Sequence, residues 1–185
     1  MDLIVLGVLE FSSIAIGIQA LDEMLKVAPI KIMEARTMCP GKYLVVFSGD
    51  VASVEFSFRK GLEIGKDLIV DSLFLPQVHE SVIPAIGKII SSEEWNAIGI
   101  IETLSVTASI EAADVAAKVG GIRIVEIRLA IGFGGKSYVK IQGYLDAVEA
   151  AVEAGSAKAI SKGQLCMKTI IPRPHNELKS FFMSI

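Results

Sequence analysis

The residues of this chain with the clearest chemical potential are Cys39 and the two that follow it, Pro40 and Gly41. Proline fixes φ and lacks an N–H, and glycine permits a positive φ, so the run predicts a tight, exposed turn that presents one thiol. Metal sites usually show several ligands at characteristic spacings, and Cys39 has none nearby in the sequence. Taken alone, it therefore indicates a small reduced side chain at a turn.

Other reactive residue types fit structural roles better than chemical ones. Cys166 stands among apolar neighbours on an expected strand and is predicted to be a core residue. His79 and His175 have no nucleophile or carboxylate at an informative spacing, so packing is favoured over general-base catalysis. Glu10 and Glu102 are expected at strand ends before helices, where a negative charge is favourable.

A glycine-rich run, Gly132-Phe133-Gly134-Gly135-Lys136, superficially resembles a phosphate-binding loop. It lacks the four-residue spacing before Gly-Lys that a P-loop requires, and the residues after it predict a strand rather than a helix. The sequence therefore argues against a nucleotide site.

Composition excludes several classes of protein. Hydrophobic residues make up 52% of the 185, and the mean hydropathy is +0.56. Nevertheless, the longest charge-free stretch, 11–21, is about half the length of a membrane-spanning helix, and no signal peptide is evident. The net charge of −3, without a Lys/Arg cluster, argues against nucleic acid. Two cysteines at non-equivalent positions favour a reducing cytoplasm over a disulfide framework.

The elements around these residues occur twice. An offset of about 92 residues near the start grows to about 96 near the end, as expected of two copies with loop insertions. The matched segments are 6–10 with 98–102, 22–32 with 114–124, and 75–79 with 171–175. We therefore expect two domains, 1–90 and 91–185, with a linker at 87–96. Such a chain can occupy two equivalent positions of a ring while one copy diverges.

Both repeats predict the order β-α-β-β-α-β followed by a short helix, which is an α/β (α+β) fold of the ferredoxin-like type. Ser12-Ser13 and Thr103 to Ser105 are expected to cap the first helix of each repeat. Strands are predicted at 3–9, 31–37, 43–48 and 67–74, and at 97–101, 123–129, 137–142 and 164–171. Helices are predicted at 13–27, 50–60, 106–119 and 145–159.

Several separated motifs, in the same order in both halves, resemble the shell-protein domain of bacterial microcompartments. They are Ala-Ile-Gly-Ile-Ile-Glu-Thr (97–103), Glu-Ala-Ala-Asp (111–114) with Lys118, and Ile-Pro-Arg-Pro-His (171–175). The resemblance covers about residues 4–178. It implies tiles that pack edge to edge, with two fused domains in unpermuted order and three chains forming a pseudohexamer.

Within that family the chain most resembles the trimeric tandem shell proteins of propanediol-utilising compartments, whose Cys-Pro-Gly-Lys pore loop holds an iron–sulfur cluster. The resemblance implies that Cys39 binds one 4Fe–4S cluster per trimer, for electron transfer across the shell. Three thiolates on a threefold axis can bind three irons and leave the fourth to water or an outside ligand. A plain metabolite pore without a cluster, and mononuclear zinc with three thiolates, remain as alternatives.

The same resemblance assigns further residues. Those expected to line the pore are Met38, Pro40, Gly41, Gly132, Phe133 and Gly134, with Phe133 as a constriction. Lys26, Lys118 and Arg173 are expected at the tile edges. Gln77 and Val78 stand where the second repeat has Arg173 and Pro174, so edge contacts are expected to differ between the two kinds of side.

The implied partners are two further copies of the chain, neighbouring shell proteins and encapsulated redox enzymes, with neither nucleic acid nor membrane. The implied location is the microcompartment shell within the cytoplasm, and the implied role is structural, not enzymatic. The competing hypothesis is a small-molecule-binding regulator or enzyme on a duplicated ferredoxin-like fold. That hypothesis predicts a closed cleft with converging polar side chains.

Overall fold

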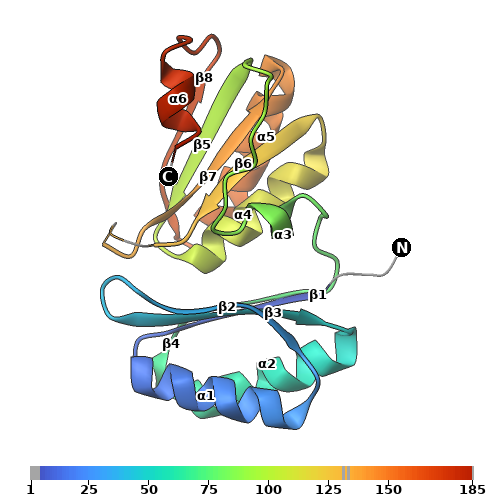
Figure 1. Ribbon diagram of the computed structural model, residues 1–185, viewed down its shortest axis with the longest axis vertical. Coiled ribbons are helices and arrows are strands. Elements are labelled where there is room, and N and C mark those ends of the chain that lie inside the picture. The colour runs from blue at the N-terminus through green and yellow to red at the C-terminus, as the bar shows by residue number, and fades with distance from the viewer. Residues whose placement is uncertain (1–4, 131, 133, 185) are drawn as a thin grey trace. The chain divides into compact units, whose positions relative to one another are not determined.

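The computed structural model describes residues 5–130, 132 and 134–184. Its internal contacts divide the chain into two compact units, one ending at Val78 and the other beginning at His79. In Figure 1 the first unit runs from blue to cyan-green, and the second from green to red. No helix in the described ranges is long and apolar enough to cross a membrane.

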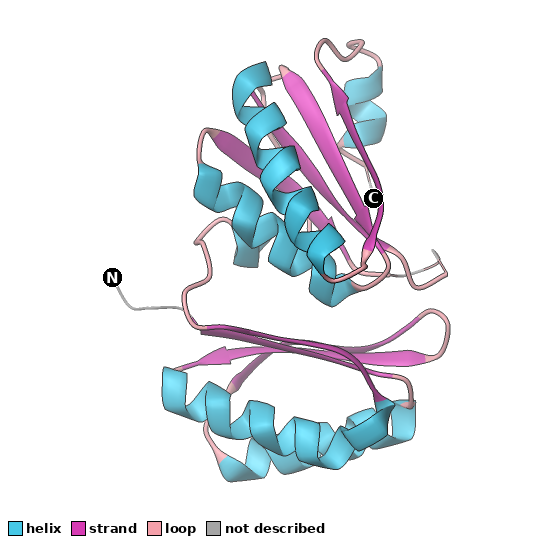
Figure 2. Ribbon diagram, turned by 180° about the vertical axis from the view of Figure 1, so that it is seen from behind, coloured by secondary structure: helices cyan, strands magenta, loops and turns pink. Residues whose placement is uncertain are grey.

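The first unit is a four-stranded antiparallel sheet with two helices on one face (Figures 1 and 2). The strand order, β2-β3-β1-β4, is that of a ferredoxin-like fold and confirms the predicted topology. Its elements are β1 (Val5–Phe11), α1 (Ile14–Val27), β2 (Lys31–Met38), β3 (Lys42–Gly49), α2 (Val51–Gly65), η1 (Lys66–Leu68) and β4 (Ile69–Leu75).

The second unit repeats this arrangement with strand order β6-β7-β5-β8. Its elements are α3 (Val82–Ala85), β5 (Ala97–Thr103), α4 (Val106–Val119), β6 (Ile122–Arg128), β7 (Ser137–Gly143), α5 (Leu145–Ser161), β8 (Leu165–Ile171) and α6 (Leu178–Phe182). The main departures from the predicted bounds are longer second helices, because α2 runs on to Gly65 and α5 to Ser161.

A glycine in the first strand of each repeat leaves room for a large neighbouring side chain on the sheet face that the helices cover. A Cβ at Gly7 would lie 2.4 Å from Cζ of Phe47, and one at Gly99 would lie 2.4 Å from Cγ2 of Val152. Phe47 is wholly buried in the core of the first unit. The glycine of both matched strand motifs is therefore required by the volume of its neighbour.

Polar residues begin three of the four long helices. Ser13 Oγ accepts the N–H of Ile16 at 3.4 Å, and Ser105 Oγ accepts that of Ala108 at 3.0 Å, which confirms both predicted caps. Asp50 Oδ1 accepts the N–H of Ser53 at 2.9 Å at the start of α2. At the start of α5 the equivalent residue is Tyr144, whose side chain makes no capping hydrogen bond.

The predicted linker lies along β6. Gly87 N–H donates to Ile127 O at 2.9 Å and Ile90 N–H donates to Val125 O at 2.8 Å. The short helix α3 also packs against β6 and α4. Residues 79–96 are therefore held by the second unit.

The C-terminal helix α6 covers part of the second sheet on the face opposite α4 and α5 (Figure 1). Phe182 packs with Ile98 and makes an edge contact with Trp95, their ring centroids 5.7 Å apart. Beneath it, Lys140 Nζ donates to Phe182 O at 2.7 Å and pairs with Glu126 at 2.8 Å. A buried cation thus holds the backbone of the C-terminal segment.

Candidate functional site

Each unit has two ends, which the strand registers define. At the hairpin end, Met38 pairs with Lys42 and Thr103 pairs with Ser137, so the β2–β3 and β6–β7 connections lie there. At the opposite end, which we call the rim end, Val5 pairs with Gly49 and Ala97 pairs with Gly143. Cys39 and the expected tile-edge residues consequently lie at opposite ends of their units.

Cys39 occupies the tip of the β2–β3 hairpin. Gly41 N–H donates to Met38 O at 2.9 Å and closes a four-residue turn in which the Cys39–Pro40 peptide bond is cis. Gly41 has φ +85°, a conformation that glycine adopts without a Cβ penalty. Cys39 is half-buried, and Pro40 and Gly41 are exposed. The predicted tight turn that presents a thiol is confirmed.

Met38, also expected at the pore, differs from its neighbours because its side chain is only 4% exposed. It ends β2 and packs inside the unit. The turn therefore presents Cys39, Pro40 and Gly41 rather than Met38.

An ion pair lies next to each hairpin. Lys42 Nζ is 3.4 Å from Oε2 of Glu10, whose side chain is wholly buried. Lys136 Nζ lies 3.8 Å from Oε1 of Glu102, and both of these side chains are more exposed. Sequence analysis placed the two glutamates at strand ends but did not identify their lysine partners. Lys42 and Lys136 stand at matching positions after the two hairpins, and this recurrence could have indicated the pairs.

The second hairpin carries its glycines for conformational reasons. Gly132, Gly134 and Gly135 have φ of +78°, +61° and +90°. A Cβ at Gly132 or Gly134 would meet no atom within 4 Å, so backbone conformation rather than crowding favours glycine there. Phe133, the expected constriction, lies outside the described residues. The two repeats therefore differ at this connection, where one presents Cys39 and the other presents glycines.

Metal ligation within one chain is not supported by the part of the structure that is described. There, no three His, Cys, Asp or Glu side chains come close enough to hold a metal ion. Cys166 at the start of β8 is half-buried instead of fully within the core, and desolvation raises the pKa of its thiol.

The two expected edge lysines lie at the rim ends in different surroundings. Lys26 pairs with Asp22 at 2.5 Å and Glu23 at 3.0 Å, and the hydrogen bond to Asp22 is the main cause of its raised pKa. Lys118 pairs at 2.5 Å with Asp114, whose side chain is only 3% exposed. The equivalent helices thus present one lysine paired with exposed carboxylates and one paired with a buried carboxylate.

The remaining candidates at the rim serve local structure. His79 Nδ1 lies 2.8 Å from Ser81 Oγ, and the His79 backbone N–H donates to Asp114 Oδ1 at 2.8 Å. The exposed His175 accepts the Glu177 N–H at 3.3 Å. Arg173 is exposed beside Tyr144 and shares a surface depression with it. Neither histidine is part of a catalytic arrangement in the described residues.

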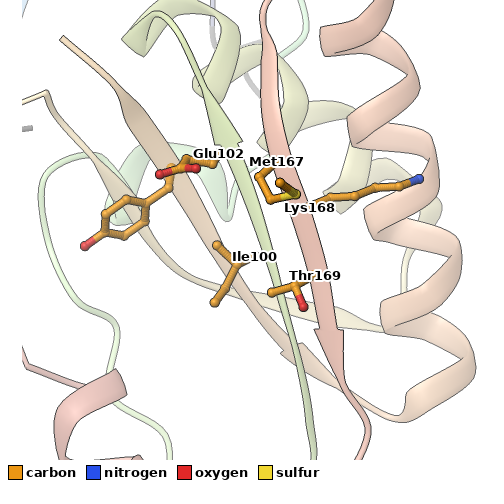
Figure 3. A pocket seen from close by; sticks show the side chains of 6 residues that line it. Ile100, Glu102, Met167, Lys168 and Thr169 are labelled. Atoms are coloured by element: carbon orange, nitrogen blue, oxygen red, sulfur yellow. The ribbon is translucent and has the colours of Figure 1, made fainter. Parts of the chain in front are cut away.

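A pocket on the outer face of the second sheet tests the hypothesis of a ligand-binding regulator (Figure 3). Ile100, Met167 and Thr169 project from neighbouring strands, with Glu102 at one end. Lys168 points the other way, where it pairs with Glu153 on α5. The pocket is open and its exposed lining is mostly apolar, so it is not the closed cleft that the hypothesis predicts.

Comparison with known proteins supports the repeat architecture. The family model of the BMC domain matches twice, at residues 5–78 and 97–174. The chain is 42% identical over 173 residues to the bacterial microcompartment shell protein PduT of Citrobacter freundii, covering 94% of each. The shell protein EutM of Salmonella typhimurium is 38% identical over 86 residues, which are 46% of this chain and 88% of that one.

A solved structure extends the likeness to the whole tandem fold. A crystal structure of a microcompartments protein from Desulfitobacterium hafniense superposes with a TM-score of 0.88 at 43% identity, covering 97% of this chain and 99% of that one. The chain is therefore a tandem member of the BMC-domain family, the structural shell proteins of bacterial microcompartments.

Proposed function

We propose that three copies of this chain close into one shell tile, and that Cys39 from each copy meets at the central pore to hold a 4Fe–4S cluster. The observation that carries the proposal is the unequal pair of hairpins: one repeat presents a thiol at its tip and the other presents glycines. Three thiols at one axis then follow from threefold symmetry. Encapsulated redox enzymes and neighbouring shell proteins are the partners of such a tile.

Exposed apolar residues on α1 support a ring of copies. Ile14, Ile18 and Leu25 are 37%, 52% and 48% exposed. Their counterparts in α4 are Val106 and Ile110, which are wholly buried, and Ala117, which is 4% exposed. A stripe of large apolar side chains on a soluble surface marks an interface.

The outer face of the second sheet, opposite α4 and α5, also leaves apolar side chains exposed. Ile100 and Tyr138 are half-buried and Met167 is 64% exposed. Head-to-tail contact between α1 of one copy and this sheet face of the next covers both, and such contacts close into rings. Three two-repeat chains supply the six positions of a hexagonal tile.

The hairpin ends face the axis of such a ring. Pro40 and Gly41 of one repeat then alternate with Gly132 and Gly134 of the other around the pore. Three of these residues are glycines without a side chain, Pro40 is compact, and all four lie on exposed turns, so six hairpins can approach closely. A cluster fits on the axis only if the six hairpin turns do not interdigitate across the pore.

The residues fit a three-thiolate site. Cys39 is partly accessible at its tip, and the exposed Pro40 and Gly41 leave room for neighbouring turns. When bound, a 4Fe–4S cluster supplies one-electron transfer, which suits exchange between the interior and exterior of a shell. Cys39 supplies one of three thiolates, and the turn closed by Gly41 N–H holds it toward the axis.

Anaerobic reconstitution with iron and sulfide tests the cluster. Wild type is expected to turn brown and to bind four irons per three chains, whereas Cys39→Ser stays colourless while remaining trimeric. Cys166→Ser is the matched control and is expected to behave as wild type. Colourless, iron-free wild-type trimers would contradict the cluster and leave the plain pore. One zinc ion per three chains, lost in Cys39→Ser, would contradict it in favour of the mononuclear site.

A further inference from the structure

His79, which follows the last strand of the first repeat, is bound by a helix of the second repeat. Its backbone N–H donates to Oδ1 of Asp114 at 2.8 Å, and the other carboxylate oxygen, Oδ2, lies 2.5 Å from Nζ of Lys118. The Asp114 side chain is only 3% exposed, and His79 is half-buried. One aspartate on α4 thus joins a backbone donor that follows the preceding repeat to a lysine of its own helix.

The second repeat ends in the same local structure as the first. A bend, a turn and a short helix follow β4, and the same order follows β8. His79 O accepts the N–H of Val82 at 3.0 Å, and at the matching place His175 O accepts the N–H of Leu178, also at 3.0 Å. Each histidine Nδ1 lies 3.3 Å from the backbone nitrogen two residues further on. The backbone N–H of His175 therefore corresponds to the N–H that Asp114 binds.

The first helix of the first repeat carries the matching acceptor. Asp22 on α1 occupies the position that Asp114 has on α4. Its Oδ2 lies 2.5 Å from Lys26 Nζ, the same distance that separates Asp114 Oδ2 from Lys118 Nζ. The lysine contact at Oδ2 leaves Oδ1 able to accept a second hydrogen bond. The Asp22 side chain is 62% exposed, and His175 is exposed as well. Both groups of the contact therefore occur a second time, each open to a partner.

We propose that the backbone N–H of His175 in one copy donates to Asp22 Oδ1 of the next copy and holds the two together in the ring. This inference rests on the proposed tile, in which the second repeat of one copy meets the first repeat of another as the first meets the second within the chain. Its partner is a second copy of this chain. The donor follows β8 and the acceptor lies on α1, the strand and the helix that carry the exposed Met167 and Ile18.

Asp22 is expected to contribute to association rather than to the folding of one chain. In the separate chain its carboxylate is exposed, and an exposed ion pair such as that with Lys26 contributes little. Between copies it becomes a charged acceptor for a backbone N–H. Such hydrogen bonds are stronger than neutral ones, and removing the acceptor leaves the donor unsatisfied.

Glu23 provides the contrast, because it is a second carboxylate on the same turn of α1. Its Oε1 also pairs with Lys26, at 3.0 Å, and its side chain is 35% exposed. The counterpart of Glu23 in α4 is Val115, which has no hydrogen-bonding side chain. The contact seen between the repeats therefore requires no polar group at this position.

Dilution of full-length trimers tests the contact. Asp22→Ala is expected to raise the concentration at which half of the trimers dissociate by about tenfold or more, because a charged-acceptor hydrogen bond is lost at every junction between copies. Asp22→Asn keeps an oxygen acceptor and is expected to lie between Asp22→Ala and wild type. Glu23→Ala, which removes the neighbouring carboxylate from the same lysine, is the matched control and should leave that concentration unchanged.

Hydrogen exchange supplies the direct readout. In wild-type trimers the His175 amide is expected to exchange slowly, and to become fast on dissociation or in Asp22→Ala. The His79 amide, bound by Asp114 of the same chain, should stay protected in every sample. Asp22→Ala trimers as stable as wild type, or a His175 amide that exchanges equally in trimers and in separate chains, would overturn this contact while leaving the ring. Wild-type chains that stay monomeric by light scattering would instead contradict the ring itself, and the contact with it.

Discussion

The Asp114 carboxylate links Lys118 on α4 to the backbone of His79, which lies between the two matched repeats. Its Oδ2 lies 2.5 Å from Lys118 Nζ, and its Oδ1 accepts the backbone N–H of His79 at 2.8 Å. The carboxylate is 3% exposed, whereas the equivalent Asp22 is 62% exposed. One matched position therefore has a structural role in the second repeat and a solvated one in the first.

Asp114→Ala is expected to destabilise the protein by about 2 kcal/mol, because it leaves the partly buried His79 N–H without its acceptor. Asp22→Ala, the matched control, is expected to cost less than about 0.5 kcal/mol, since exposed ion pairs contribute little. Urea unfolding of both variants measures the difference. Equal losses would contradict the distinction between the two sites.

Asp50 makes the start of α2 sensitive to acid. Hydrogen bonds from Ser53, first from its hydroxyl and then from its backbone N–H, lower the pKa of Asp50 below 3.8. Because the folded-state pKa lies below the unfolded one, its stabilising effect is complete above the unfolded pKa and is lost as pH falls through the folded pKa. The Tm of Asp50→Ala is therefore expected to lie below wild type at neutral pH and to approach it near pH 2. A Tm difference that persists in acid would contradict this cause.

At the start of α5 a capping side chain can be added rather than removed, because Tyr144 supplies no hydrogen-bond acceptor there. It has φ −68° and ψ 152°, the extended conformation of an N-cap residue, but no capping hydrogen bond. Tyr144→Asp is expected to stabilise the protein by about 1 kcal/mol by accepting a free helix N–H. Tyr144→Ala, which removes the ring and supplies no acceptor, is the control. Thermal unfolding of the two variants should rank Asp above Ala.

Gly7 is required by Phe47. Gly7→Ala places a Cβ 2.4 Å from the Phe47 ring and is expected to cost about 2 kcal/mol through overpacking. The double variant Gly7→Ala/Phe47→Leu is expected to recover part of that loss relative to the sum of the two single changes. A strictly additive double-mutant cycle would show that the two residues do not interact.

Lys140 should hold α6 in place. Its Nζ pairs with Glu126 and donates to Phe182 O, and both ionic side chains are at most 9% exposed. Lys140→Met leaves the Glu126 carboxylate with Arg128 alone and is expected to destabilise the protein by about 3 kcal/mol. Hydrogen exchange is expected to quicken over 178–184 more than over α4. Uniform quickening would indicate a general loss of stability instead.

Sequence alone was sufficient for the features that neighbours along the chain control. Apolar periodicity located the strands and helices, Ser13 and Ser105 marked helix starts, and Pro40 with Gly41 predicted the exposed turn. Because the second repeat matches the first in sequence, the topology predicted for the first domain was also predicted for the second. These properties depend on φ, ψ and hydrogen bonds within a few residues.

Tertiary structure decided what depends on distant elements. Sequence could not show that Asp114 is buried and Asp22 exposed, that Glu10 pairs with Lys42 across 32 positions, or that Lys140 holds the C-terminal backbone. Burial and charge pairing arise only when separate strands and helices pack, because desolvation depends on every surrounding element. The duplicated sequence therefore determined two similar folds, and packing made equivalent residues in them different.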